Sequence, residues 1–209
     1  MKGKIEYISH KEAIEFLLPK HYSGRVPSIS YSFGWKIDDK LVAVCTFGKP
    51  ASNSLCEGVC GKEHSSKVYE LNRLCRVEEL GLPLSQFVSG CLRRIAIDDL
   101  IIVSYSDTSM NHNGYIYQAC NFLYTGQTKQ RTDKYTEGNK HSRHYSNEKQ
   151  GEYRKVRSAK NRYVFLAVSS KVKRKKYLRA LKYPILPYPK AINSNYTLGD
   201  FQKPVLVKS

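Results

Sequence analysis

The sequence of 209 residues contains no apolar run that approaches the ~20 residues needed to cross a lipid bilayer. Its first residues lack the apolar stretch of a secretory signal peptide. The six cysteines show no paired spacing, which argues against a disulfide framework and for reduced thiols. These absences predict a cytoplasmic protein that has no membrane partner.

Acidic residues are also scarce, and their shortage is confined to one part of the chain. Residues 1–126 hold 14 Lys and Arg against 13 Asp and Glu, a net charge of +1, whereas residues 127–184 hold 18 against 4, a net charge of +14. Eight of the sixteen tyrosines lie in or beside that basic segment. Because cations neutralise phosphates and aromatic rings stack on unpaired bases, the segment is typical of a nucleic-acid-binding region. The alternative is a solvated, disordered tail.

Hydrophobic periodicity predicts an α/β (α+β) fold with a mixed central sheet flanked by helices. Strands are expected at 4–8, 28–37, 41–47, 68–77, 100–103 and 163–168, with a further strand starting at Phe122. Helices are expected after Ser9, after Pro83, after Asn111 or Asn113, and over 171–182, whereas 48–66 is expected to be a long loop. One domain is predicted over residues 1–168, including the basic segment 127–163. Residues 169–209 are expected to form a basic C-terminal extension.

The stretch 100–126 is where this fold is expected to keep its chemistry. An apolar run of four residues ends in Ser104, Ser106, Asp107 and Thr108, just before an expected helix start. A buried strand that ends in polar residues beside a helix N-terminus is a common place for an α/β active site. The alternative is that these polar residues only cap the helix.

Other polar residues stand out because their surroundings are apolar. Asn72 and Arg73 lie within an alternating, half-buried strand, where polar groups are costly unless they are paired. Cys56, Cys60 and His64 follow a Cys-x3-Cys-x3-His spacing, which is not the Cys-x2-Cys of a structural zinc knuckle. We read them as buried thiols and a nearby His, with metal ligation as the weaker alternative.

The predicted order of strands and helices resembles the acetyltransferase fold of the GNAT superfamily. The segment Asn111-x2-Gly114-x2-Tyr117-x3-Asn121-Phe122 is similar to a late motif of that superfamily. Where GNAT enzymes have a Gly-rich turn for the coenzyme A pyrophosphate, residues 76–83 of this chain have one glycine and two glutamates.

Five segments resemble the Mom family of bacteriophage DNA-modifying proteins. They are Thr46-Phe47-Gly48-Lys49-Pro50, Leu55 to Gly61, Glu70-Leu71-Asn72-Arg73-Leu74, Leu84 to Ser89, and Val103 to Gly126. The resemblance as a whole extends over most of residues 20–145. The resemblance implies conversion of adenine in DNA to an N6-carbamoylmethyl derivative, which protects phage DNA from restriction enzymes in the cytoplasm of the host.

The same resemblance implies a set of site residues. Its functional positions fall on His21, Tyr22, Arg73, Ser85 and Asp107. Adenine N6 is a weak nucleophile because its lone pair is delocalised into the ring, so a base or an activated donor is required. Asp107 is expected to accept or hold the N6 proton.

Four more expectations concern the ligands. Tyr22 or Tyr115 is expected to stack on the base or act as an acid, and Arg73 is expected to hold the donor together with Ser85 and Ser89. The target adenine must be flipped out of double-stranded DNA. Backbone contacts are expected at Lys129, Arg131, Lys173, Arg174, Lys175 and Lys176.

The small-molecule donor is left open. The carbamoylmethyl group is joined through its methylene carbon, so simple acyl transfer from acetyl-CoA does not give the product. Acetyl-CoA, another two-carbon donor and activation at iron all stay open. Two alternatives to DNA modification also stay open: a conventional acetyltransferase acting on RNA or protein, and a non-catalytic nucleic-acid-binding protein.

Overall fold

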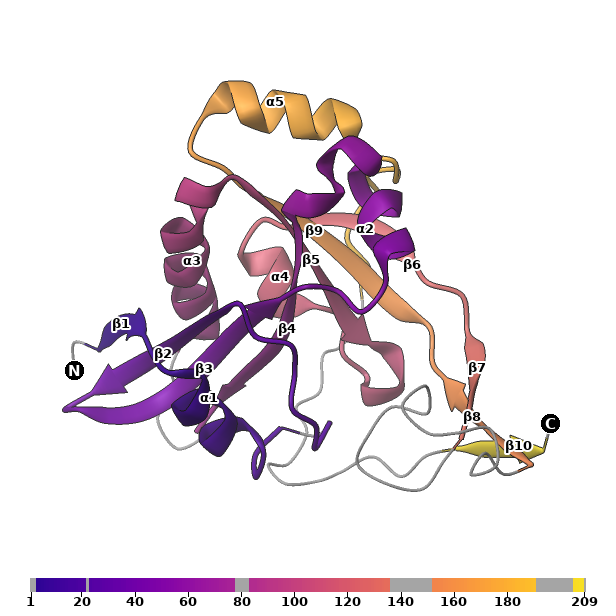
Figure 1. The fold of residues 1–209 in the computed structure, drawn as a ribbon, viewed down its shortest axis with the longest axis horizontal. Helices are drawn as coiled ribbons and strands as arrows, with labels where there is room; N and C mark the ends of the chain where they lie inside the picture. The colour runs from indigo at the N-terminus through magenta and orange to yellow at the C-terminus, as the bar shows by residue number, and fades with distance from the viewer. Residues whose placement is uncertain (1–2, 22, 78–82, 136–151, 191–204, 209) are drawn as a thin grey trace.

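The computed structural model describes residues 3–21, 23–77, 83–135, 152–190 and 205–208 (Figure 1). A seven-stranded sheet has the order β1-β2-β3-β4-β5-β9-β6, and a smaller sheet has the order β10-β8-β7. The strands are β1 (Lys4–Tyr7), β2 (Tyr31–Ile37), β3 (Lys40–Gly48), β4 (Val68–Arg76), β5 (Leu100–Asp107), β6 (Leu123–Gln127), β7 (Arg131–Lys134), β8 (Tyr153–Arg157), β9 (Lys160–Ala167) and β10 (Leu206–Lys208). The α-helices are α1 (His10–Leu17), α2 (Asn53–Cys60), α3 (Leu84–Ile95), α4 (Tyr115–Ala119) and α5 (Lys171–Ala180).

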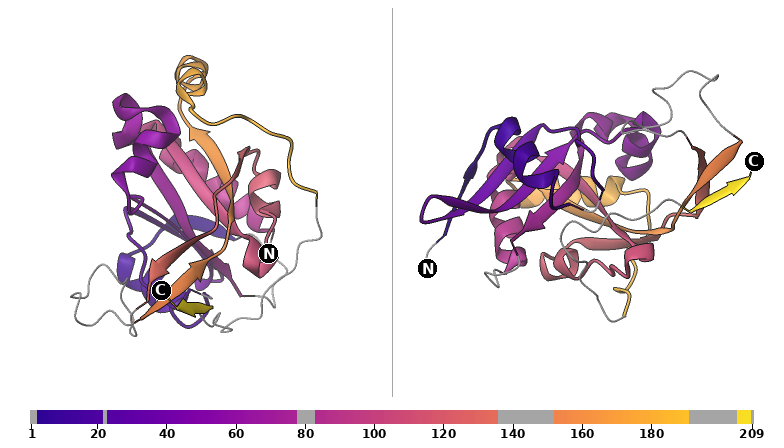
Figure 2. Two further views of the ribbon diagram at one scale, coloured as in Figure 1. Left: turned by 90° about the vertical axis from the view of Figure 1, so that its right-hand side faces the viewer. Right: turned by 90° about the horizontal axis from the view of Figure 1, so that it is seen from below.

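Helices cover both faces of the large sheet, as Figures 1 and 2 show. α1 and α2 pack on one face, and α3 and α4 pack on the other. Side chains of β5 alternate between these layers because the period of a strand is two residues. Ile102 joins the cluster with α3, and Ile101 and Val103 join the cluster with α2. The predicted mixed sheet flanked by helices is confirmed.

The centre of the sheet contains a fork. β4 and β5 are parallel but pair only from Val68 to Glu70 and from Ile101 to Val103. Beyond these residues β4 stays paired with β3, and β5 stays paired with β9. The two strands therefore separate toward their C-terminal ends, with Arg73 beyond the β5-paired part of one strand and Asp107 beyond the β4-paired part of the other.

Local sequence signals account for several elements. Ser9 and Glu12 form the capping box that starts α1. Asp38 and Asp39 form the two-residue turn between β2 and β3, with positive φ at both positions. The predicted loop at 48–66 is wrong, because it contains α2, which Ser52 caps through the amide of Leu55. Its short stripe of Cys56, Val59 and Cys60 packs on the sheet.

Tertiary partners extend β5 beyond its apolar run. Ser104 Oγ donates to Leu71 O at 2.9 Å, and Asn161 Nδ2 donates to Ser106 Oγ at 3.3 Å, so polar side chains are accommodated within the sheet. The expected N-caps are also wrong. Asn111 adopts a left-handed conformation at the end of a 3-10 turn, and α4 instead starts after Gly114.

α5 packs against the end of the sheet. Its buried Tyr177 donates through its hydroxyl to Asp99 O at 3.2 Å. The chain then continues as a strap, residues 181–190, that runs from α2 to the edge strand β6. Lys182 N donates to Val59 O and Leu186 N donates to Tyr124 O, each at 2.9 Å. No helix in the described part of the chain is both long and apolar enough to cross a membrane.

Candidate active site at the fork of the central sheet

Arg73 and Asp107 lie on the same face of the sheet. Asp107 shares its face of β5 with Ile101 and Val103, which pack toward α2. Cys75 packs in the α1 cluster, and Arg73, two residues earlier, has the same orientation. The fork thus presents a cation on one prong and a carboxylate on the other, on the side covered by α1 and α2.

Asp107 is a buried and heavily hydrogen-bonded carboxylate. Oδ1 accepts from Ser109 N at 3.1 Å, from Ser109 Oγ at 2.7 Å and from Ser158 Oγ at 2.5 Å. Oδ2 lies 3.2 Å from Lys160 Nζ. Burial raises the pKa of Asp107, but the hydrogen bonds from Ser158 and Ser109 and the charge of Lys160 outweigh it, so the pKa is lowered. Asp107 is ionised at neutral pH, and an incoming amine must compete with these donors.

A bulge in the sheet positions Arg73. The β3–β4 register shifts between Thr46 and Phe47, which leaves Asn72 as the extra residue. Asn72 Oδ1 accepts from Thr46 Oγ1 and Asn72 Nδ2 donates to Ser28 O, both at 2.7 Å. Arg73 Nη2 donates to Arg25 O at 3.3 Å. These contacts hold the loop that follows α1 against β4.

That loop carries His21, which is buried. Its Nδ1 accepts from Ser23 N at 3.2 Å. Because a backbone N–H can only donate, the neutral ring must carry its hydrogen on Nε2. Burial, together with the nearby charges of Arg73 and His112, lowers the pKa of His21 to about 3. His21 is therefore a neutral hydrogen-bond donor at physiological pH.

The structure adds three residues that the sequence analysis missed. His112 N donates to Asp107 O at 3.2 Å, and the pKa of the half-buried His112 is lowered by burial and raised in part by Asp107. Lys160 reaches Asp107 from β9. Glu70 is the last residue of β4 that pairs with β5, and burial raises its pKa against the charges of Arg73 and Lys160. The sequence did offer a signal for His112, which lies five residues after Asp107 and between two asparagines that were interpreted as helix caps.

Several predicted site residues lie elsewhere. Ser85 and Ser89 are on α3, on the opposite face, where Cys120 Sγ lies 3.4 Å from Ser85 O and 3.5 Å from Ser89 Oγ. Tyr115 starts α4 and is 65% exposed. Tyr22, and residues 78–82 of the expected pyrophosphate turn, are outside the described residues. The structure therefore brings His21, Arg73 and Asp107 into one region but not Ser85, Ser89 or Tyr115.

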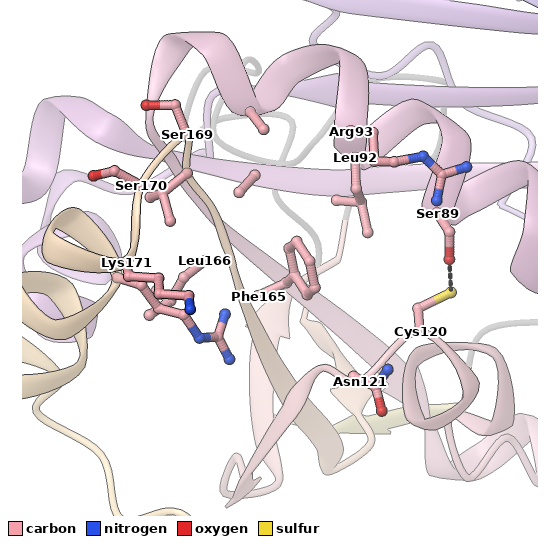
Figure 3. A pocket seen from close by; sticks show the side chains of 14 residues that line it. Ser89, Leu92, Arg93, Cys120, Asn121, Phe165, Leu166, Ser169, Ser170 and Lys171 are labelled. Atoms are coloured by element: carbon pink, nitrogen blue, oxygen red, sulfur yellow. Dashed lines mark hydrogen bonds between the residues drawn. The ribbon is translucent and has the colours of Figure 1, made fainter.

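A hollow of about 500 Å³ lies on the α3 and α4 side of the sheet. Figure 3 shows Ser89 at this hollow, with Phe165 at its centre and Lys171 on the opposite wall. Arg73 and Ser85 are not among its lining residues. The three residues expected to hold the donor thus do not form one cluster.

The predicted DNA contacts fall into two places. Lys129 precedes β7 and Arg131 starts it, so both belong to the small-sheet side. Lys173, Arg174, Lys175 and Lys176 are on α5, where Lys173 forms an ion pair with Asp99 and Lys176 lies 3.3 Å from Glu63.

The weak metal candidates lie between α2 and α5. Cys56 and Cys60 are buried, and burial raises the pKa of Cys60 to about 11. The ring of His64 packs edge-on against Tyr177 with centroids 5.1 Å apart. Among the described residues, no group of three His, Cys, Asp or Glu side chains is placed to hold a metal ion.

The strand order and the parallel, forked β4–β5 pair define a GNAT-like protein. An N-acetyltransferase from Staphylococcus aureus Mu50 matches with a TM-score of 0.50 and 10% identity over 80% of this chain and 99% of that chain. The spermidine/spermine N-acetyltransferase of Vibrio cholerae, in mutant forms, gives 0.48 and 10% identity over 85% and 98%. Similarity at this level of identity concerns the fold, and the predicted GNAT-like fold is confirmed.

The particular family follows from the sequence match. The chain belongs to the Mom protein family, whose family model matches residues 2–190. This confirms the family resemblance read from the sequence segments. No curated protein sequence matches the chain.

Proposed function

We propose that this chain is a transferase that converts adenine in DNA to its N6-carbamoylmethyl derivative and so protects phage DNA from restriction. The observation that carries the proposal is the polar cluster at the fork of a GNAT-like sheet, in a member of the Mom family. His21, Arg73 and Asp107, which the family resemblance singled out, come from three distant segments and lie on one face. The GNAT-like fold supports group transfer as the wider class of reaction.

The product defines what the site must do. Adenine N6 attacks the methylene carbon of the donor, a nitrogen–carbon bond forms, and the bond to the leaving group breaks with its electron pair. One N6 proton must be removed. We assign Arg73 to the negative charge of the donor or leaving group, since guanidinium groups bind carboxylate and phosphate well.

The protonation states of the two histidines and of Asp107 suggest the remaining roles. His21 has its ring hydrogen on Nε2 and would donate to a substrate oxygen or ring nitrogen. We assign acceptance of the N6 proton to the Asp107–His112 pair, in which the carboxylate stabilises a protonated imidazole. Lys160 and Ser158 would hold Asp107 in place.

Charged groups inside the fork argue for chemistry rather than binding alone. Burying a charge costs free energy even when the charge is paired. A non-catalytic nucleic-acid-binding module has no use for Glu70, Arg73 and Asp107 within its sheet. A conventional acetyltransferase acting on RNA or protein is the second candidate, because the structural neighbours are N-acetyltransferases.

The test is nucleoside mass analysis of DNA from bacteria that express the chain. We expect adenine that carries one extra carbamoylmethyl group, and DNA that resists cleavage at adenine-containing restriction sites. The matched control is Arg73→Lys, which keeps the positive charge but loses the planar fork of donors. We expect this variant to be folded and inactive.

A second bacterial strain serves as a positive control. It distinguishes a host that lacks the donor from a chain that has a different function. A Mom-family protein that modifies DNA in the same host shows that the donor is present. Unmodified adenine beside that positive control, with soluble protein in both strains, would refute the proposal. Acetylated RNA or protein would instead support the conventional acetyltransferase.

A further inference from the structure

The small sheet extends past the fork, and two of its three strands, β7 and β8, form a ribbon that continues the large sheet, with β10 paired to β8. β7 and β8 pair antiparallel and continue from β6 and β9, and Figure 1 shows them projecting from the body. The link from β8 to β9 passes directly over Asp107, because Ser158 Oγ donates to Asp107 at 2.5 Å and Lys160 Nζ lies 3.2 Å from it. The ribbon therefore begins at the edge of the candidate active site.

Both faces of this ribbon carry cations, and the face that includes Lys155 is the one whose charge interacts with Arg25, Lys160 and Asp107. The register places Arg131 opposite Arg157 and Asp133 opposite Lys155, so these four side chains share a face. Asp133 lies 2.8 Å from Arg157 Nε and 3.7 Å from Arg131 Nε. One carboxylate is thus set against three cations on this face.

Further cations lie next to that face. The pKa of Lys155 is lowered by burial and then by the charges of Arg157, Arg25 and Lys160, which come from the ribbon, the loop after α1, and β9. Cations that repel one another favour the binding of an anion between them. The contacts of Ser158 and Lys160 with Asp107 place these cations at the edge of the candidate active site.

α5 is a contrasting basic surface. Leu100 and Asp107 are the two ends of β5, and an eight-residue strand is roughly 23 Å long. Ala167, which pairs with Leu100, leads into α5, so α5 lies at the end of the sheet away from Asp107. Two of its lysines lie beside Asp99 and Glu63, and two arginines of the ribbon lie beside Asp133, so position relative to Asp107 is what distinguishes the two surfaces. A flipped base stays attached to its own phosphates, so the backbone must pass close to the fork.

We propose that the ribbon face with Arg131, Lys155 and Arg157, together with Arg25, holds the phosphate backbone of duplex DNA beside the target base. The identity of that base as adenine rests on the proposed function.

Two double variants test this surface. Arg131→Gln/Lys155→Gln removes two charges from the ribbon, and Arg174→Gln/Lys175→Gln removes two from α5. The readout is affinity for a fluorescently labelled DNA duplex over a salt series, measured by anisotropy without donor. Each phosphate contact contributes about 0.9 to the slope of log affinity against log salt. We expect the ribbon variant to lose about 1.8 of this slope and the α5 variant to keep it.

Equal loss in both variants, or loss in the α5 variant alone, would overturn the proposal. A ribbon variant that loses affinity for single strands but not for duplex would also overturn it. Circular dichroism checks folding, and Arg25→Gln/Arg131→Gln gives the same test should Lys155→Gln unfold the chain. DNA binding is measured without turnover, so the two proposals can fail separately. A reduced salt slope in the ribbon variant, with no modified adenine from the parent chain, refutes only the proposed function. Modified adenine from the parent, with an unchanged salt slope in the ribbon variant, refutes only the ribbon as the DNA contact.

Discussion

The two faces of the central sheet differ in character near the fork, one being apolar and the other polar. On the α3 and α4 face, Phe122 is fully buried, and its ring centroid lies 5.3 Å from that of Tyr117 and 5.1 Å from that of Phe165. On the α1 and α2 face, Arg73 and Asp107 stand on the two prongs and are held by hydrogen bonds. Hydrophobic burial stabilises a fold without specifying a reaction, whereas buried charge costs free energy and is expected where chemistry needs it. Substitutions on the α3 and α4 face should therefore lower stability, whereas substitutions on the α1 and α2 face should lower activity.

The largest effect is expected from Phe122→Ala. Truncation of a buried aromatic ring removes its transfer free energy and leaves a cavity, so we expect the free energy of unfolding to fall by about 3–5 kcal/mol. Activity per folded molecule should stay near that of the parent. Urea unfolding monitored by circular dichroism gives the stability, and modified adenine per unit of folded protein gives the activity. A stable but inactive variant would show that this face takes part in the chemistry.

Asp107→Asn should give the opposite result. The amide keeps the size of the carboxylate but removes the charge that stabilises a protonated His112 and pairs with Lys160. We expect a loss of modification of at least about 100-fold, the usual scale for removing general acid–base assistance. Unfolding should stay cooperative and duplex affinity nearly unchanged.

The control for that variant is Ser158→Ala, which removes one hydrogen bond to Asp107 and keeps the negative charge. It should retain most of the activity. Equal losses in both variants would mean that the position of the loop, and not the charge of Asp107, limits the reaction.

A smaller effect should appear in the pH dependence of stability. The pKa of His21 falls to about 3 in the folded chain, against about 6.5 in an unfolded one. Below pH 6.5 the unfolded state binds a proton that the folded state does not, so stability should decrease as the pH falls, by up to about 1.4 kcal/mol per pH unit. The contribution is fully present above pH 6.5. Urea titrations of the parent and of His21→Gln between pH 7.5 and 4.5 measure the difference, and parallel curves would show that His21 is not buried in its neutral form.

The fold was largely predictable from local patterns, and the site only in part. Alternating apolar residues indicated β2 to β4, and the family segments placed Arg73 and Asp107 in one function. The fork itself has no local signal, because it depends on where the pairing of β4 and β5 stops. His112 was overlooked, since its role depends on a turn that brings its amide back to Asp107 O.

The polar region after Gly126 shows the same limit. Arg131 to Lys134 and Tyr153 to Arg157 alternate among charged side chains and carry few apolar residues, so composition indicated a nucleic-acid-binding region, with a solvated tail as the alternative, and predicted no strands. They form strands because they pair with each other and continue the register of β6 and β9. The DNA contacts expected on α5 and at Lys129 and Arg131 stay predictions until the salt slopes are measured.

The strap at residues 181–190 has a consequence for how copies of this chain behave in concentrated solution. β6 is the last strand of its sheet, and an exposed outer strand is a template on which another molecule can add its own strand. Leu186 N donates a hydrogen bond to Tyr124 O, and the Tyr188 hydroxyl donates to Phe122 O at 2.7 Å. The strap therefore covers this margin of the sheet and limits the addition of a strand from a second copy.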